Sequence, residues 1–171
     1  MPATGGFILA SNHLSYLDPI TLGVASPRKL NFMAKKDLFS NHFFSGLISV
    51  LGAMPLERNR ADLSALKGAV RCLREGAALV LFPQGSRINM NSSQVHPGVG
   101  FLAIKAGVPI IPACIQGTDI ALPKGSRFIR PAKITVCFGE PIVLERRCEP
   151  DYLEIAQEVM SQIRILHADK K

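Results

Sequence analysis

The amino-acid sequence predicts an α/β fold, a single domain over residues 1–171 with a largely parallel or mixed sheet flanked by helices. Two observations support this prediction. Short apolar runs that end in turn residues alternate with helix-forming segments, which is the pattern of strands joined by crossover helices. The composition, 47% hydrophobic and 19% charged over 171 residues, suits one hydrophobic core and excludes a disordered chain.

The first strand is predicted over residues 7–10, an apolar run that leads into a polar loop. A short helix over 20–25 follows, with Pro19 in its first turn and Asp18 as its N-cap. The later strands are predicted over residues 30–34, 54–56, 78–82, 108–115 and 134–138.

The clearest helix is predicted over residues 62–75, because its leucines and valine recur at spacings of three and four and form one apolar stripe. Further helices are predicted over 98–106 and 151–167, and a long connection over 117–131. Because the strands run largely parallel, the loops that follow them meet at one edge of the sheet, where ligands bind in such folds.

Charge is distributed unevenly along the chain, whose net charge is +7. Residues 1–130 contain 14 Lys and Arg against 6 Asp and Glu, whereas residues 131–171 contain 6 against 7. The basic part favours anionic lipid head groups or phosphorylated ligands, although solubility alone also explains such an excess. Nucleic acid is not an expected partner, because there is no Lys/Arg-rich run, no Trp and only two Tyr for base stacking.

Cysteine spacing and hydropathy exclude other classes. The four cysteines have no nearby Cys or His at zinc-ligand spacing, so no metal site is expected and a reduced, cytosolic setting is the simpler interpretation. No run approaches the roughly 18 apolar residues that a spanning helix needs. Residues 38–56 contain no Asp, Glu, Lys or Arg but include Phe43 and Phe44, so they are predicted to form either a core helix or an acyl-chain groove at the membrane interface.

His13 and Asp18 lie on the loop between the first strand and the first helix, the usual location of catalytic residues on an α/β scaffold. A carboxylate that turns back to one imidazole nitrogen would fix the tautomer and leave the other nitrogen as a general base. Taken alone, the two residues are equally consistent with a surface histidine beside a helix cap.

Four stretches of the chain, taken together, favour the catalytic interpretation of His13 and Asp18. They are Ser11-Asn12-His13-Leu14-Ser15-Tyr16-Leu17-Asp18, Gly52-Ala53-Met54-Pro55-Leu56-Glu57-Arg58, Phe82-Pro83-Gln84-Gly85-Ser86-Arg87 and Gly107-Val108-Pro109-Ile110-Ile111-Pro112. In this order and spacing they resemble the four sequence blocks of the glycerolipid acyltransferases, whose best-known members are the 1-acylglycerol-3-phosphate acyltransferases. The first stretch matches the family's Asn-His-x-x-x-x-Asp. The third matches its Phe-Pro-Glu-Gly-Thr-Arg, with Gln84 for Glu and Ser86 for Thr.

The resemblance implies a glycerol-3-phosphate acyltransferase-like fold and a transferase of phospholipid biosynthesis. It would move a fatty acyl group from acyl-CoA or acyl-carrier protein to the free hydroxyl of a lysophospholipid, most often 1-acylglycerol 3-phosphate, by direct attack and without an acyl-enzyme. His13 would be the base and Asp18 would orient it. The acyl donor would be the only small-molecule partner besides the acceptor, with no separate cofactor. The enzyme would bind peripherally to an anionic membrane surface, on its cytoplasmic side.

The same resemblance assigns phosphate binding to Arg58 and Arg87, whose guanidinium groups suit a phosphate, although most arginines form surface salt bridges. Gly85 would let the backbone approach a ligand and donate to an oxyanion, with a plain turn as the alternative. Further substrate contacts are expected from Asn12, Ser15, Gln84 and Ser86. Asn12 and Ser15 are equally suited to bracing the loop by local hydrogen bonds.

Gln84 departs from the family pattern, because an amide can neither carry charge nor act as a base. Two alternatives follow from this change. The acceptor would be another lyso-lipid, or the protein would be a lipid-binding relative that has lost catalysis. Acceptor-dependent release of free CoA distinguishes an enzyme from a binding protein.

Overall fold

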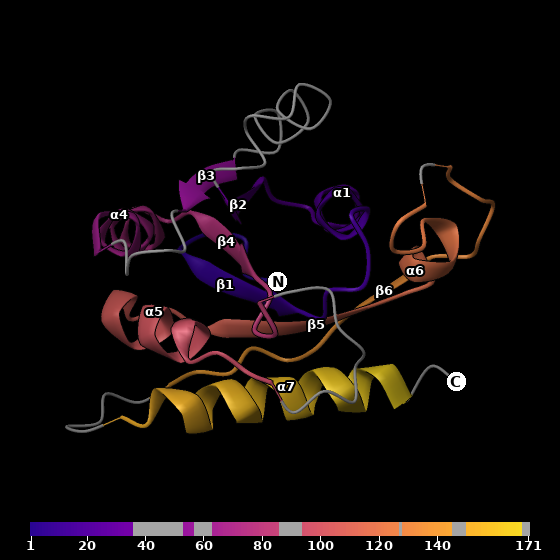
Figure 1. Cartoon of the computed structure of the whole chain (residues 1–171). Coiled ribbons are helices and arrows are strands. Elements are labelled where there is room, and N and C mark those ends of the chain that lie inside the picture. Colours follow the sequence, from indigo (N-terminus) through magenta and orange to yellow (C-terminus); the bar gives the residue numbers. More distant parts are fainter. Residues whose placement is uncertain (36–52, 57–62, 86–93, 127, 145–149, 169–171) are drawn as a thin grey trace.

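The protein is described from a computed structural model of residues 1–35, 53–56, 63–85, 94–126, 128–144 and 150–168 (Figure 1). Within these residues, one sheet of six strands has the order β3-β2-β4-β1-β5-β6. The first five strands pair in parallel, and β6 runs antiparallel to β5. The strands are β1 (Phe7–Ser11), β2 (Leu30–Lys35), β3 (Ala53–Leu56), β4 (Ala78–Leu81), β5 (Ile110–Gln116) and β6 (Thr135–Phe138).

The described helices cover the two faces of the sheet unequally. One core cluster joins one face of the sheet to helices α4, α5 and α7, and the other joins the opposite face to α1. Figure 1 shows α5 and α7 on one side of the sheet and α1 on the other. The helices are α1 (Asp18–Ala25), α4 (Leu63–Arg74), α5 (Gly98–Ala106), α6 (Thr118–Ala121) and α7 (Tyr152–Ala168).

Strand β1 lies inside the sheet, between β4 and β5, and every residue from Phe7 to Ser11 is buried. Ile8 and Ala10 contribute to the cluster with α4, α5 and α7, whereas Phe7 and Leu9 contribute to the cluster with α1. Burial on both faces explains why this strand is a continuous apolar run and not an alternating one.

The register of the central strands determines where the following loops meet. Ala10 is paired with Leu81 of β4 and with Pro112 of β5, and Ser11 is paired with Ala113. Because these three strands are parallel, His13, Phe82 and Gly117 all follow them at the same edge of the sheet. This edge therefore contains the predicted catalytic loop.

The predicted α/β fold is confirmed, and each predicted strand is found within two residues of its expected limits. Two details differ. Asp18 is not the N-cap of the first helix, because Leu17 occupies that position and Asp18 is the first helical residue. The connection over 117–131 also contains one helical turn, α6, which is separated from β5 by Gly117 alone.

Other expectations lie wholly or partly outside the described residues. Phe43 and Phe44, together with most of the charge-free stretch, are among the residues that the structure does not describe. Of the described helices, none is both long and apolar enough to cross a membrane. The assignment of residues 1–171 to a single acyltransferase domain stays a prediction.

Candidate active site

The imidazole of His13 is hydrogen-bonded to the carboxylate of Asp18, as the sequence predicted. Nδ1 of His13 lies 2.8 Å from Oδ2 of Asp18, and the two side chains are 18% and 0% exposed. A carboxylate only accepts hydrogen bonds, so Nδ1 carries the proton and Nε2 of the neutral ring keeps its lone pair. The ring is thus held in the tautomer that a general base requires.

Three further donors hold the carboxylate of Asp18. The backbone amides of Leu14 and Ser15 donate to Oδ2 over 2.6 and 2.8 Å, and the hydroxyl of Thr118 donates to Oδ1 over 2.6 Å. Because a buried carboxylate is costly unless it is hydrogen-bonded, this set of donors explains how Asp18 remains fully buried. It also explains why Asp18 does not cap α1, since its oxygens point back into the preceding loop.

Phe82 fixes the plane of the histidine ring. This residue directly follows β4, and its ring stacks on that of His13 with centroids 4.2 Å apart and an angle of 19° between the planes. Phe82 belongs to one of the stretches singled out in the sequence, but a contact with His13 was not expected. The available signal in the sequence was that Phe82 and His13 each follow a predicted strand of the same parallel sheet.

Asn12 and Ser15 connect the catalytic loop to the end of β5 and to α6. The side chain of Asn12 donates to the carbonyl of Ile115 and accepts from its amide, each over 2.8 Å. The hydroxyl of Ser15 donates to the carbonyl of Leu122 over 2.9 Å. Both side chains are buried, at 0% and 1% exposure. The structure therefore gives them a bracing role, and direct contact with substrate stays a prediction.

Gln84 and Gly85 form the turn after β4. Gln84 is fully buried, and Gly85 has a φ of +68°, a conformation that favours glycine. The amide of Gly85 donates to the carbonyl of Phe82 over 2.8 Å, so this N–H stabilises the turn. Contact of Gln84 or Gly85 with substrate or an oxyanion stays a prediction. Arg58, Ser86 and Arg87 lie outside the described residues.

Thr118 is a site residue that no motif in the sequence indicates. It lies 100 residues after Asp18, in the turn that follows β5, and it is fully buried. Gly117 shapes this turn with a φ of +86°, and a Cβ there would lie 2.1 Å from the carbonyl oxygen of Lys133. A polar residue directly after a buried parallel strand was the available signal.

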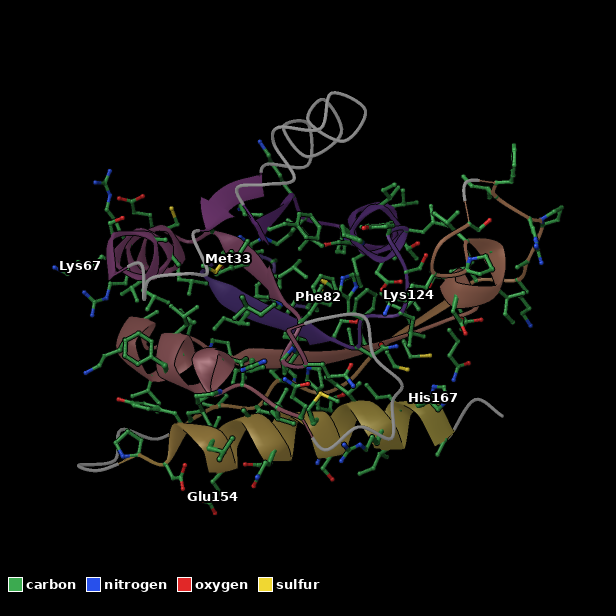
Figure 2. The ribbon with its side chains drawn as sticks, viewed as in Figure 1. Met33, Lys67, Phe82, Lys124, Glu154 and His167 are labelled. Atoms are coloured by element: carbon green, nitrogen blue, oxygen red, sulfur yellow. The ribbon has the colours of Figure 1, made fainter. Side chains whose placement is uncertain are left out.

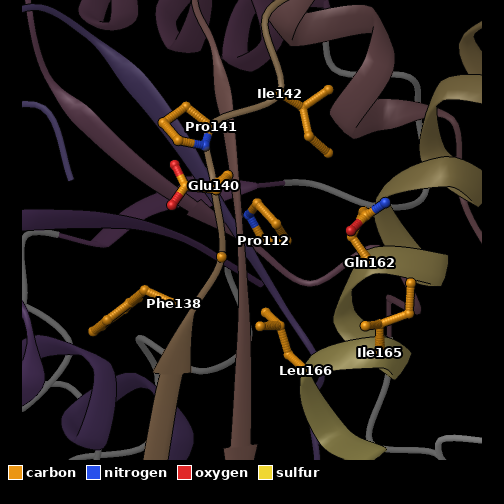
Figure 3. A pocket seen from close by; sticks show the side chains of 9 residues that line it. Pro112, Phe138, Glu140, Pro141, Ile142, Gln162, Ile165 and Leu166 are labelled. Atoms are coloured by element: carbon orange, nitrogen blue, oxygen red, sulfur yellow. The ribbon is translucent and has the colours of Figure 1, made fainter. Parts of the chain in front are cut away.

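A pocket of about 480 Å³ lies away from this loop, between the end of β6 and α7 (Figure 3). Its lining includes Pro112, Phe138, Ile142 and Leu166, and none of the predicted site residues. Ile142 is bridged to Ile110, the first residue of β5, whereas the catalytic loop meets the end of that strand. The pocket is therefore not an extension of the His13 site.

Cys114 is buried beneath α7, opposite Cys137 of β6. Burial, with a smaller contribution from Cys137, raises the pKa of the Cys114 thiol to about 12. This thiol therefore stays protonated at neutral pH and is a poor nucleophile. In the described ranges, His, Cys, Asp and Glu side chains form no group of three that could hold a metal ion.

A histidine oriented by a buried carboxylate, at the carboxyl edge of a parallel sheet, defines an α/β protein equipped for general-base chemistry. Comparison with known proteins makes the class more specific. The chain belongs to the Acyltransferase family, whose model matches residues 1–116. It is therefore an acyltransferase, and the resemblance noted in the sequence is confirmed.

Individual relatives support this assignment across most of the chain. The chain is 31% identical over 143 residues to the 1-acyl-sn-glycerol-3-phosphate acyltransferase of Bacillus subtilis, covering 83% of this chain and 69% of that protein. The Streptococcus pneumoniae protein of the same name is 30% identical over 170 residues, covering 96% and 62%. The crystal structure of the 1-acyl-sn-glycerophosphate acyltransferase PlsC from Thermotoga maritima matches with a TM-score of 0.80 at 27% identity, covering 99% and 68%.

Proposed function

We propose that this acyltransferase transfers a fatty acyl group from an acyl thioester to the free hydroxyl of 1-acylglycerol 3-phosphate, in phospholipid biosynthesis. The observation that carries the proposal is the 2.8 Å contact between Nδ1 of His13 and Oδ2 of Asp18, which leaves Nε2 able to accept a proton. The names of the relatives from Bacillus subtilis and Streptococcus pneumoniae support this acceptor.

In this mechanism, Nε2 of His13 accepts the proton of the acceptor hydroxyl while its oxygen attacks the thioester carbonyl. A carbon–oxygen bond forms and the carbon–sulfur bond breaks, and the sulfur leaves as a thiol with the proton that His13 returns. The carboxylate of Asp18 stabilises the transient imidazolium. A positioned base of this kind contributes about 10²–10⁴-fold to the rate.

The acceptor phosphate is proposed to bind Arg58 and Arg87, whose sequence positions match the family blocks. A charged hydrogen bond is worth about 1.5–3 kcal/mol, so removal of either guanidinium should weaken use of the acceptor by about 10–150-fold. The matched test is Arg58→Ala and Arg87→Ala at limiting acceptor, with Arg71→Ala as control, because the side chain of Arg71 on α4 is exposed and paired with Glu75, the residue after that helix. Unchanged use of the acceptor in both site variants would refute the phosphate role.

Gln84 is the observation that favours a second acceptor. This amide is fully buried in the turn after β4, where the family has a carboxylate. The amide at this position is expected to alter recognition of the acceptor. It leaves the general base in place, because His13 and Asp18 are still paired. Another lysophospholipid is therefore the alternative acceptor.

The donor is proposed to be acyl-CoA or acyl-carrier protein, and the setting the cytoplasmic side of an anionic membrane, with peripheral attachment. The basic excess in residues 1–130 supports attraction to such a surface.

The deciding experiment measures free CoA released from acyl-CoA against a panel of lysophospholipids, with and without a phosphate head group. We expect release of CoA with 1-acylglycerol 3-phosphate and not with the other acceptors. His13→Ala should abolish it while circular dichroism shows a retained fold, and His96→Ala, which removes an exposed histidine, should retain it. Release of CoA by His13→Ala would refute the proposal. So would the absence of CoA release by the wild type with every acceptor in the panel.

A further inference from the structure

Residues 117–126 and 128–134, here called the α6 segment, follow β5, and three of their large hydrophobic side chains are more than 60% exposed. Ile120, Phe128 and Ile129 are 63%, 80% and 68% exposed. Figure 1 shows α6 and the chain that follows it projecting beyond the end of the sheet, on the side of the molecule that carries α1. The described residues offer no apolar surface that covers these side chains.

Hydrogen bonds connect the described residues of this segment. The hydroxyl of Ser126 accepts from the amide of Phe128 and donates to its carbonyl, at 3.2 and 3.0 Å. The amide of Arg130 donates to the carbonyl of Ala121 over 2.7 Å and closes the loop. Phe128 therefore combines a hydrogen-bonded backbone amide and carbonyl with an exposed side chain.

Basic residues are interleaved with the apolar ones along the segment. Lys124, Arg130 and Lys133 are exposed, against the single acidic residue Asp119 in this segment. Figure 2 labels Lys124 on the side of the molecule that carries α6. Apolar side chains interleaved with cations suit an anionic bilayer, because the apolar groups enter the interface while the cations remain with the head groups.

The α6 segment is bonded directly to the catalytic loop at two points. Thr118 donates to the carboxylate of Asp18 over 2.6 Å, and Leu122 accepts from the hydroxyl of Ser15 over 2.9 Å. A surface that holds this segment therefore lies close to the loop that carries His13.

We propose that the α6 segment docks on an anionic phospholipid membrane, with Ile120, Phe128 and Ile129 entering the interface and the exposed basic residues contacting lipid phosphates. This places the catalytic loop beside the bilayer that contains the acceptor. The inference rests on the proposed function for that last step, but the docking itself is independent of acyl transfer.

The test uses the whole chain and vesicles of phosphatidylcholine with or without phosphatidylglycerol. Phe128→Asp should lower binding to the anionic vesicles by about tenfold or more, because the ring no longer enters an apolar phase. Arg130→Gln with Lys133→Gln should lower it further at low salt, and binding of the wild type should decrease as salt rises.

Val143→Asp is the matched control. Val143 is 77% exposed, close to the value for Phe128. It follows Ile142, which is bridged to the first residue of β5, so it lies at the opposite end of that strand from the α6 segment. This variant introduces the same charge and should bind anionic vesicles as the wild type does.

The outcomes separate docking from catalysis. Equal vesicle binding by the wild type and Phe128→Asp overturns the docking proposal, as does an equal loss in Val143→Asp. A wild-type oligomer in solution that Phe128→Asp dissociates, with vesicle binding unchanged, identifies the surface as a protein contact instead. Phe128-dependent vesicle binding without acyl transfer would refute the proposed function while the docking stands.

Discussion

The hydroxyl of Thr118 donates a hydrogen bond of 2.6 Å to Oδ1 of Asp18, a residue 100 positions earlier in the chain. Oδ2 of the same carboxylate is occupied by His13 and by the amides of Leu14 and Ser15. Thr118 therefore supplies the bond that fixes the remaining oxygen. The orientation of the histidine depends on the turn after β5 as well as on its own loop.

Thr118→Val should lower kcat for acyl transfer by about tenfold or more and leave KM for the acceptor unchanged. A hydrogen bond to a charged group is worth about 1.5–3 kcal/mol, and valine fills the same volume without a donor. Thr118→Ser keeps the hydroxyl and should restore most of the rate. Steady-state kinetics of the three proteins test this, and a serine variant as slow as the valine variant would show that packing is what matters.

The loss of unfolding free energy on replacing Asp18 should depend strongly on which side chain replaces the carboxylate. In Asp18→Asn, the amide oxygen can accept from the two backbone amides and His13 while its NH₂ donates to Thr118, so a loss of about 1–2 kcal/mol in unfolding free energy is expected. In Asp18→Ala these donors lose their acceptor, and at about 1–3 kcal/mol for each buried unsatisfied donor the total loss should be about 3–5 kcal/mol. Urea unfolding measures both values, and equal losses would contradict the network.

Gly117→Ala should damage both stability and catalysis, whereas Gly125→Ala should affect stability only slightly. Both glycines have left-handed backbones, with φ of +86° and +88°, so both variants carry a strain of about 1–2 kcal/mol. Only at Gly117 would the new Cβ meet a backbone oxygen, that of Lys133 at 2.1 Å.

The difference between these two variants isolates the steric clash from the strain of the backbone. Relief of the clash would move Thr118 away from Asp18, so the kcat of Gly117→Ala should fall as that of Thr118→Val does. Thermal unfolding and kinetics of the pair provide the measurement. Equal melting temperatures would show that the turn at Gly117 adjusts freely.

Alkaline pH should destabilise the protein through Cys114. Its pKa is raised from 9.0 to about 12 in the fold, so between these values the unfolded thiol has lost its proton while the buried thiol keeps it. The unfolded state then binds fewer protons, and the free energy of unfolding decreases as pH rises above about 9. Denaturant titrations of the wild type and Cys114→Ala should show a shallower decline in the variant. Parallel curves would contradict this origin.

The sequence alone predicted the elements whose signal is local. The continuous apolar run of β1 and the apolar stripe of α4 both follow from burial, and both elements are found where expected. The pairing of His13 with Asp18 was also accessible, because a loop of five residues can turn a carboxylate back to the ring.

Contacts between distant segments were not accessible in the same way. Thr118, Ile115 and Phe82 reach the catalytic loop only through the register of β1 with β4 and β5, which no short pattern determines. The N-cap at Asp18 was predicted wrongly for a related reason. Its carboxylate accepts hydrogen bonds from the preceding loop and from Thr118, and so does not cap the first turn of α1.

The order of synthesis has a consequence for this site. His13 emerges early from the ribosome, but Ile115 and Thr118, which hold Asn12 and Asp18, follow about 100 residues later. At about 5–20 residues per second, the nascent chain therefore spends roughly 5–20 s with its histidine exposed and its carboxylate incompletely bonded. The protein can gain the oriented base only after β5 has inserted beside β1, so a chain that is released before that point is inactive.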